Sequence, residues 1–390
     1  MYMSNSELLD QGGFGCIYHP GITCKGNKSK RKNIVTKLQR KSFNSKNEIK
    51  IGKMIKSIAD YERFFIPVIS FCNVYLRHIN NQLASQCKII KENQKQYVLM
   101  KLPYVKNEPI LEYLSGLGEK DVIKIIVNTA DYLLEGISKL LDIGIVHFDL
   151  KGDNIIFDTK TEKPLIIDFG ISIPIERPRF QNNVSQYFYV YAPEYYVWPL
   201  EVHIACFLFH GKDAKSTITE SESHRIANDC VSNNKLLEEL SKEKREKYIS
   251  DCKKVAETYV GLSASELLEK VKASYKTWDN YAISILFLKL ILYTCCDSDK
   301  KKINMSKDSY AAIKHKSNTH ILNLLEKLFL TNIEVEPSKR LSLQETRKQM
   351  NIIKHLLEGH NNNNNKINIK KLAKMNEHTI GLNTFIPRKN

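Results

Sequence analysis

Three oxygen-bearing side chains, Asp149, Asn154 and Asp168, have the order and spacing of a site for phosphate and a divalent cation. Asp149 and Asn154 stand five positions apart on a polar stretch between apolar runs, and Asp168 ends the next apolar run. This pattern predicts a small hairpin with the three side chains at one edge. Because Mg²⁺ prefers one or two protein oxygens together with phosphate oxygens, Asp168 and Asn154 would leave coordination positions open for a nucleotide. Asp149 would then be free for another role.

The sequence around these residues resembles two motifs of the eukaryotic protein kinases. Residues 147–154 (HFDLKGDN) are similar to the catalytic loop, and Asp168-Phe169-Gly170 is similar to the magnesium-binding triplet that follows it. The order and separation of the two motifs match the family. The chain departs from it at Phe148, where the family has an arginine.

The resemblance implies a role for each polar residue of the two motifs. Asp149 would orient the substrate hydroxyl or accept its proton, and Lys151 would steady the transferring phosphoryl group. Asn154 and Asp168 would hold Mg²⁺, with Mn²⁺ as an alternative ion. His147 is expected to be structural and to brace the loop from the core.

A glycine-rich segment near the N-terminus extends the resemblance. Residues 8–18 are expected to form a strand, a turn and a second strand, in which glycines let the backbone approach phosphates and donate N–H groups. Such a hairpin alone indicates only a turn. Beside the catalytic loop it resembles the kinase nucleotide loop, although Asp10 replaces the first glycine. The residues expected to contact nucleotide here are Gly12, Gly13, Phe14, Gly15 and Ile17.

Lys37 and Glu48 are expected to form an ion pair beside the nucleotide. Lys37 lies on a short predicted strand, 33–38, at the position of the family's phosphate-binding lysine. Glu48 lies on a helix predicted at 44–58 and would fix that lysine. Alternatively, Ser45 and Glu48 form a capping box, and Glu48 only starts the helix.

Further strands are predicted at 65–71 and 86–91, and a third leads through Met100 to Pro103. The last stretch resembles the segment between the kinase lobes, which implies that Met100 faces the adenine pocket. The amphipathic pattern at 119–143 predicts the long helix that delivers the chain to the catalytic loop.

The second half of the chain carries three further resemblances. Ala192-Pro193-Glu194 resembles the motif that ends the activation segment, and Arg340 matches the late arginine that pairs with its buried glutamate. Asp279, which precedes a long apolar run, resembles the aspartate that anchors the catalytic loop. Because the stretch from Glu194 to Asp279 is longer than the family pattern, we expect a helical insertion at about 200–275.

Charge and composition allow several partners. The 59 lysines and arginines exceed the 43 aspartates and glutamates, which gives a formal net charge of +16. That excess suits polyanions, but it equally reflects a composition rich in Lys, Asn and Ile. Direct nucleic-acid binding is not expected, although the charge permits it, because no basic motif is interleaved with aromatic residues. The composition is similar to that of kinases of large DNA viruses.

The cysteine pattern and the apolar stretches bear on location. The nine cysteines include no CxxC pair and no regular spacing, so we expect reduced thiols in a cytoplasmic protein, in the host cytoplasm or the virion if the chain is viral. Residues 1–10 carry no apolar leader, and the longest apolar stretch, 281–296, is too short to span a bilayer. Neither a secretory signal nor a membrane span is expected.

We therefore expect an α+β, bilobal, protein-kinase-like fold. It would have a β-rich N-lobe over 1–103, a helical C-lobe over 104–358 and an Asn- and Lys-rich tail over 359–390. The resemblance implies transfer of the γ-phosphoryl group of ATP, with Mg²⁺, to Ser or Thr hydroxyls of a protein substrate. Lys151 favours Ser/Thr specificity, although Tyr187 stands where the family has a threonine.

Two alternative activities stay open. A pseudokinase scaffold would bind nucleotide without turnover, but it would be expected to lack Lys37, Asp149 or Asp168, and all three are present. A small-molecule phosphotransferase shares the His-x-Asp-x-x-x-x-Asn pattern, but Lys151 and the Ala-Pro-Glu motif favour a protein substrate. The sequence indicates neither the physiological substrate nor the oligomeric state.

Overall fold

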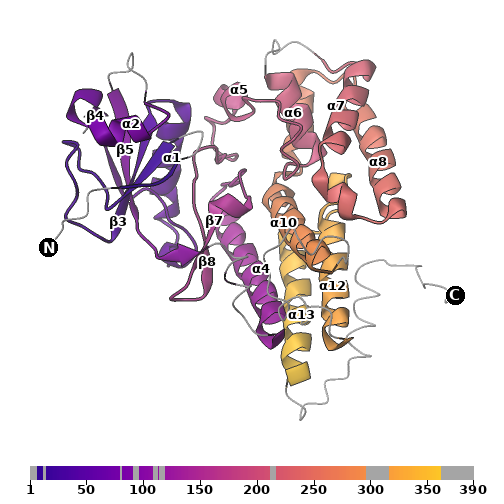
Figure 1. The fold of residues 1–390 in the computed structure, drawn as a ribbon. Coiled ribbons are helices and arrows are strands. Elements are labelled where there is room, and N and C mark those ends of the chain that lie inside the picture. Colours follow the sequence, from indigo (N-terminus) through magenta and orange to yellow (C-terminus); the bar gives the residue numbers. More distant parts are fainter. Residues whose placement is uncertain are drawn as a thin grey trace.

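The computed structural model describes residues 7–11, 15–79, 81–90, 96–108, 113, 119–210, 217–295 and 316–361. Figure 1 shows two lobes, a sheet-rich N-lobe built from the start of the chain and a helical C-lobe built from the rest. The structure thus confirms the bilobal α+β fold. Gly12, Gly13 and Phe14, and the tail beyond Asn361, lie outside the described residues.

The N-lobe contains a five-stranded antiparallel sheet in the order β1-β2-β3-β5-β4. β-Branched residues in the central strand favour extended backbone, and its register places Lys37 opposite both Ile17 and Met100. The strand predicted at 86–91 is wrong, because a short helix ends there and turns follow it. The elements are β1 (Glu7–Gln11), β2 (Gly15–His19), β3 (Ile34–Arg40), α1 (Phe43–Ile55), β4 (Ser70–Tyr75), α2 (Asn81–Gln86) and β5 (Gln96–Pro103).

The C-lobe is built around α4 and α10, and α12 and α13 pack beside them (Figure 1). α10 is buried on nearly all sides, as its continuous apolar sequence predicts. The elements are β6 (Asn107–Glu108), α4 (Glu119–Asp142), β7 (Ile155–Asp158), β8 (Lys163–Ile166), α5 (Val184–Tyr187), α6 (Leu200–Phe209), α7 (Glu220–Ser232), α8 (Lys242–Glu257), α9 (Ala264–Lys272), α10 (Trp278–Cys295), α12 (Lys316–Asn332) and α13 (Leu343–Asn361).

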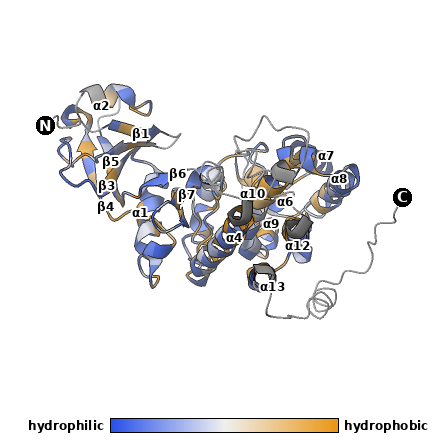
Figure 2. Ribbon diagram, turned by 60° about the horizontal axis from the view of Figure 1, so that its bottom comes forward, coloured by the Kyte–Doolittle hydropathy of each residue, from blue (hydrophilic) through white to orange (hydrophobic). Residues whose placement is uncertain are grey.

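The helices of the 200–275 region pack onto this core. Every residue of α6 from Leu200 to Leu208 is buried, and apolar residues of α7, α8 and α9 belong to the same apolar cluster as α10. Figure 2 shows hydrophobic residues around α6 and α10 and a largely hydrophilic outer helix α8. Ion pairs tie α8 to its neighbours, with Lys244 at 2.6 Å from Glu326 and Lys247 at 2.9 Å from Glu334.

Two disulfides cross-link the N-lobe, and they correct the expectation of reduced thiols. Cys16 of β2 is bonded to Cys87, 71 residues away, and Cys24 is bonded to Cys72 of β4, 48 residues away. Separations of this size leave no local signature in the sequence, because the sheet brings the partners together. Cys206, Cys230 and Cys252 are free and are buried in the C-lobe.

Within the described residues, no helix is both long and apolar enough to cross a membrane.

Candidate active site

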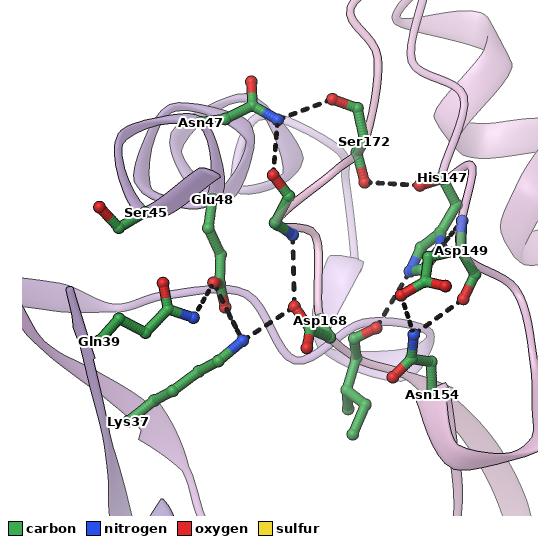
Figure 3. A network of polar contacts seen from close by, with 12 residues as sticks. Lys37, Gln39, Ser45, Asn47, Glu48, His147, Asp149, Asn154, Asp168 and Ser172 are labelled. Atoms are coloured by element: carbon green, nitrogen blue, oxygen red, sulfur yellow. Dashed lines mark hydrogen bonds and ion pairs between the residues drawn. The ribbon is translucent and has the colours of Figure 1, made fainter. Parts of the chain in front are cut away.

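Lys37 lies at the centre of a buried polar network between the lobes (Figure 3). Its Nζ lies 3.0 Å from Oε1 of Glu48 and 2.8 Å from Oδ1 of Asp168. Gln39 donates a further hydrogen bond of 2.9 Å to Oε2 of Glu48. The lysine and the glutamate are only 6% and 2% exposed, so both charges depend on this pairing.

The predicted ion pair between Lys37 and Glu48 is therefore present, and the capping alternative is wrong. α1 begins one turn earlier than that alternative requires. Ser42 is its N-cap, and Ser45 occupies the third helical position and completes the capping box. Glu48 thus lies inside the helix, on the face that looks toward β3.

The charges in this network favour an ionised Asp168. Burial would lower the pKa of Lys37, but the charges of Asp168 and Glu48 outweigh it and raise that pKa. Burial would likewise raise the pKa of Asp168, but Lys37 prevails and lowers it. At Glu48 burial prevails over the same lysine, and the pKa of that carboxyl group is raised.

The loop 147–154 is held by a buried carboxylate. Asp279, in the first turn of α10, accepts hydrogen bonds from the backbone N–H of His147 at 2.7 Å and of Phe148 at 2.9 Å. This confirms the anchoring expected of Asp279. The two bonds also hold Phe148 at a φ of 70°, a conformation that is costly for a bulky residue.

His147 braces the same loop, as expected. Its Nδ1 accepts a bond of 3.2 Å from the N–H of Asp149, so Nε2 carries the proton and donates to the carbonyl of Ile167 at 3.0 Å. The imidazole is fully buried. Both ring nitrogens are thus committed to fixing the backbone.

Asp149 and Asn154 lie in contact at the end of this loop (Figure 3). Nδ2 of Asn154 donates to the backbone carbonyl and to Oδ2 of Asp149, at 2.8 Å each. Lys151 is half-exposed and places its Nζ 3.8 Å from Oδ1 of the same carboxylate. The structure therefore brings Asp149, Lys151 and Asn154 together.

Oxygens of Asn154 and Asp168 fit a hard divalent cation. Among the described residues, Oδ1 of Asn154 and Oδ2 of Asp168 have no hydrogen-bond partner, whereas the opposite atoms of both side chains do. The two residues are linked through Ile167, whose N–H donates to the carbonyl of Asn154 at 3.0 Å. One carboxylate and one amide oxygen suit Mg²⁺, which keeps other positions for phosphate or water.

An aliphatic layer lies beside Lys37. Met100 is fully buried within it, and Ile17 of β2 packs against it from the glycine-rich strand. Such a layer suits the flat apolar faces of a purine base. Its other members include Val35, Val98, Leu102, Leu165, Ile156 and Ile167.

The glycine-rich strand approaches β3 closely. A Cβ added at Gly15 would lie 3.0 Å from the backbone oxygen of Leu38 and 3.2 Å from Cγ of Lys37. The absence of a side chain at Gly15 therefore lets β2 pass over Lys37.

The expected pairing of Glu194 with Arg340 is wrong. Glu194 is exposed, whereas Arg340 forms a two-point ion pair with Glu201, at 2.5 Å (Nη1 to Oε1) and 3.0 Å (Nη2 to Oε2). Neither Arg340 nor Glu201 has side-chain exposure. Because a buried guanidinium needs a buried carboxylate, the first turn of α6 supplies the partner. The Ala-Pro-Glu triplet alone did not reveal which glutamate is buried.

Sequence reasoning also missed the aromatic cluster around Phe148. Its ring stacks on Trp198 with centroids 4.8 Å apart and also contacts Phe188 and Trp278. Nε1 of Trp198 donates to the carbonyl of Phe148 at 2.7 Å. An aromatic residue in place of arginine, with tryptophans downstream, was the signal that could have indicated this packing.

Comparison with known families matches residues 3–203 to the protein kinase domain. "Cell division cycle 7-related protein kinase" of Homo sapiens is 27% identical over 79 residues, which cover 20% of this chain and 13% of that protein. "Serine/threonine-protein kinase 1" of African swine fever virus is 24% identical over 165 residues, which cover 41% of this chain and 54% of the viral protein. The chain thus spans less than two thirds of the length of either relative.

Proposed function

Because this chain belongs to the protein kinase domain family, we propose that it transfers the γ-phosphoryl group of ATP, with Mg²⁺, to serine or threonine hydroxyls of a protein substrate. One observation carries the proposal. Lys37 is bonded to both Glu48 and Asp168 in the same molecule in which Asp149 is anchored beside Asn154. A protein that only bound nucleotide would have no need of this complete set.

On the nucleotide side, each residue has a distinct task. Lys37, held by Glu48, binds the α- and β-phosphates, and Gly12, Gly13 and Gly15 would let the backbone donate N–H groups to them, as the resemblance implies. Met100 and Ile17 lie against the base. Asp168 and Asn154 would hold Mg²⁺, which when bound neutralises charge on the phosphates.

On the acceptor side, Asp149 accepts the proton of the attacking hydroxyl, and Lys151 steadies the transferred phosphoryl group. Lys151 is also the basis for preferring serine and threonine acceptors. The viral relative, whose name specifies a serine/threonine kinase, supports the same preference.

The proposed location is the host cytoplasm or a virion, on the strength of the viral relative. The cysteine spacing no longer supports it, because two pairs are disulfide-bonded. The proposal therefore includes that the two disulfides persist in the compartment where the protein acts.

The test is phosphoryl transfer by the purified full chain from labelled ATP and Mg²⁺ to acidic, basic and neutral protein acceptors. We expect Asp149→Asn and Asp168→Ala to reduce transfer by at least about a hundredfold, because each removes a group that acts on the transition state. Asp153→Asn is the matched control, since it changes an exposed carboxylate of the same loop and should retain activity.

The melting temperature of each variant should stay near that of the native chain. Wild-type turnover in either active-site variant would contradict the assignment. Stabilisation of the native chain by ATP and Mg²⁺ without transfer to any acceptor would indicate a pseudokinase, and transfer only to small molecules would indicate the other alternative.

A further inference from the structure

Tyr195 lies directly beside Asp149, although the sequence suggested no role for it. Its hydroxyl donates a hydrogen bond to Oδ1 of Asp149. A turn places it there, because the N–H of Tyr195 donates to the carbonyl of Ala192 at 3.0 Å and the N–H of Trp198 donates to the carbonyl of Tyr195 at 3.1 Å. The contact joins the segment before α6 to the catalytic loop.

The hydrogen bonds of Asp149 indicate which oxygen suits an acceptor hydroxyl. Oδ2 and the backbone carbonyl both accept from the amide of Asn154. Oδ1 faces Lys151, the group proposed to bind the transferred phosphoryl. Oδ1 is therefore the oxygen better placed to accept from an attacking hydroxyl, because it lies on the side of Lys151, and it is the oxygen to which Tyr195 donates.

The ring of Tyr195 also has defined contacts, with Lys151 and Trp198. Nζ of Lys151 lies 5.7 Å from the ring centroid, and Trp198 contacts the ring edge-on at a centroid distance of 4.8 Å. The phenol thus lies against both the base and the lysine.

The phenol acts as a donor in this place. Burial, and then the charge and hydrogen bond of Asp149, raise the pKa of Tyr195 far above its ordinary value. The hydroxyl keeps its proton at neutral pH. A side chain of this chain thereby presents to the base the same O–H group that a substrate would present.

We propose that Tyr195 competes with the acceptor hydroxyl for Oδ1 of Asp149, and so sets the affinity for the acceptor while keeping water away from the base. The inference rests on the proposed function and extends it. A protein acceptor displaces the phenol because it makes contacts elsewhere on the enzyme. Water has no such contacts and does not displace it.

The experiment compares the native full chain with Tyr195→Phe, which removes the hydroxyl and keeps the ring beside Trp198 and Lys151. The acceptors are dephosphorylated casein and acidic, basic and neutral serine peptides. We expect KM for the acceptor to fall on the order of tenfold, the value of one hydrogen bond to a charged group, with kcat little changed. ATP hydrolysis without acceptor should rise.

Tyr196→Phe is the matched control. Its hydroxyl lies 2.9 Å from Nζ of Lys289, so its removal should change neither KM nor hydrolysis. An unchanged KM with a lower kcat in Tyr195→Phe would overturn the inference, because Tyr195 would then only orient Asp149. A native chain that transfers to none of these acceptors would instead overturn the proposed function, and this inference with it.

Discussion

The two lobes fix the backbone around the shared polar site by different physical means. In the N-lobe the sheet buries two separate small apolar clusters, one on each face, and two disulfides cross-link it. In the C-lobe one continuous apolar cluster extends through the helices and encloses the Glu201–Arg340 pair. Cys206, Cys230 and Cys252, which lie there, are free.

The difference follows from size. A small unit buries a smaller fraction of its surface, so apolar burial alone stabilises it less than a larger one. Cross-links compensate by restricting the unfolded chain. The larger lobe has enough apolar burial to tolerate buried polar groups. Lys37 thus lies in the cross-linked lobe, whereas Asp149 lies in the lobe that is stabilised by apolar packing.

The largest expected effect is destabilisation of the N-lobe alone when a disulfide is removed. Removing either disulfide, as Cys16→Ser with Cys87→Ser or Cys24→Ser with Cys72→Ser, should lower the free energy of unfolding by about 2–4 kcal/mol. Each bond closes a long loop, of 71 and 48 residues, in the unfolded chain. Urea unfolding followed separately in each lobe should place the loss in the N-lobe.

A reductant gives the control for this prediction. A reductant breaks both disulfides, so it should destabilise the native chain about as much as replacing Cys16, Cys24, Cys72 and Cys87 by serine together, and it should leave that fourfold variant unchanged. Alkylation in denaturant without reductant should leave all four cysteines unlabelled, and labelling of any of them would contradict the cross-linked N-lobe.

The next largest effect is a loss of stability of the C-lobe at low pH. His203 of α6 is fully buried, and neither ring nitrogen has a hydrogen-bond partner of normal geometry among the described residues. Burial lowers the pKa of His203 to about 4, and the Trp198 carbonyl and the Glu201 charge oppose this only weakly. The unfolded chain, with a pKa near 6.5, therefore takes up the proton first.

The stabilising contribution of the neutral imidazole is complete above about pH 6.5 and is lost as the pH falls toward 4, by at most about 3 kcal/mol. Stability measured from pH 7 to pH 4 should fall less steeply in His203→Phe, which keeps a ring beside Trp198. The matched control is His224→Gln, at an exposed histidine paired with Glu257 at 3.2 Å. An equally steep fall in His203→Phe would contradict the prediction.

The contiguous part of the site could be predicted from the sequence, because a few adjacent residues carry its chemistry. Residues 147–154 and Asp168 needed no tertiary information, and the order of the motifs gave the two lobes. Lys37 and Glu48 could be paired because one strand and one helix position them.

The remaining features depend on contacts between residues that are distant in the sequence. Arg340 pairs with Glu201 and not with Glu194. The sequence could not predict this choice, because the two glutamates differ in burial, which depends on the tertiary fold. Each disulfide joins a strand to a distant residue outside the sheet, Cys16 of β2 to Cys87 and Cys72 of β4 to Cys24. The bond from Tyr195 to Asp149 joins positions 46 residues apart, and nothing near Tyr195 indicates it.

The smallest expected effect is that of phosphatase treatment, which should leave the activity unchanged. The contact between α1 and the segment after Asp168 is the reason. Nδ2 of Asn47, on α1, donates to the carbonyls of Gly170 at 3.1 Å and Ser172 at 2.7 Å, and Phe43 packs edge-on against Tyr187 at 5.1 Å. The segment that follows Asp168 is thus bound to the N-lobe by neutral groups. No phosphate is required to hold it.

Phe148 removes the other reason for a phosphate in this segment. Phenylalanine offers no charge-assisted hydrogen bond to a phosphate, and its ring is committed to Trp198. Enzyme treated with phosphatase should therefore be active from the first turnover, at a rate within about twofold of the untreated enzyme. A long lag relieved by autophosphorylation would contradict this.

If such a lag were observed, a double variant would test where the phosphate binds. Lys50 on α1 is the cation of the N-lobe that a phosphate in this segment could contact. Burial, and then the charges of Arg179 and Arg177, lower its pKa, so the three cations lie near one another. If the treated enzyme were slow, Arg179→Met with Lys50→Met should make the untreated enzyme equally slow. If the neutral contacts suffice, as we expect, this double variant should keep the native rate with or without phosphatase, and packing and amide hydrogen bonds would be enough to hold the segment after Asp168 against the N-lobe.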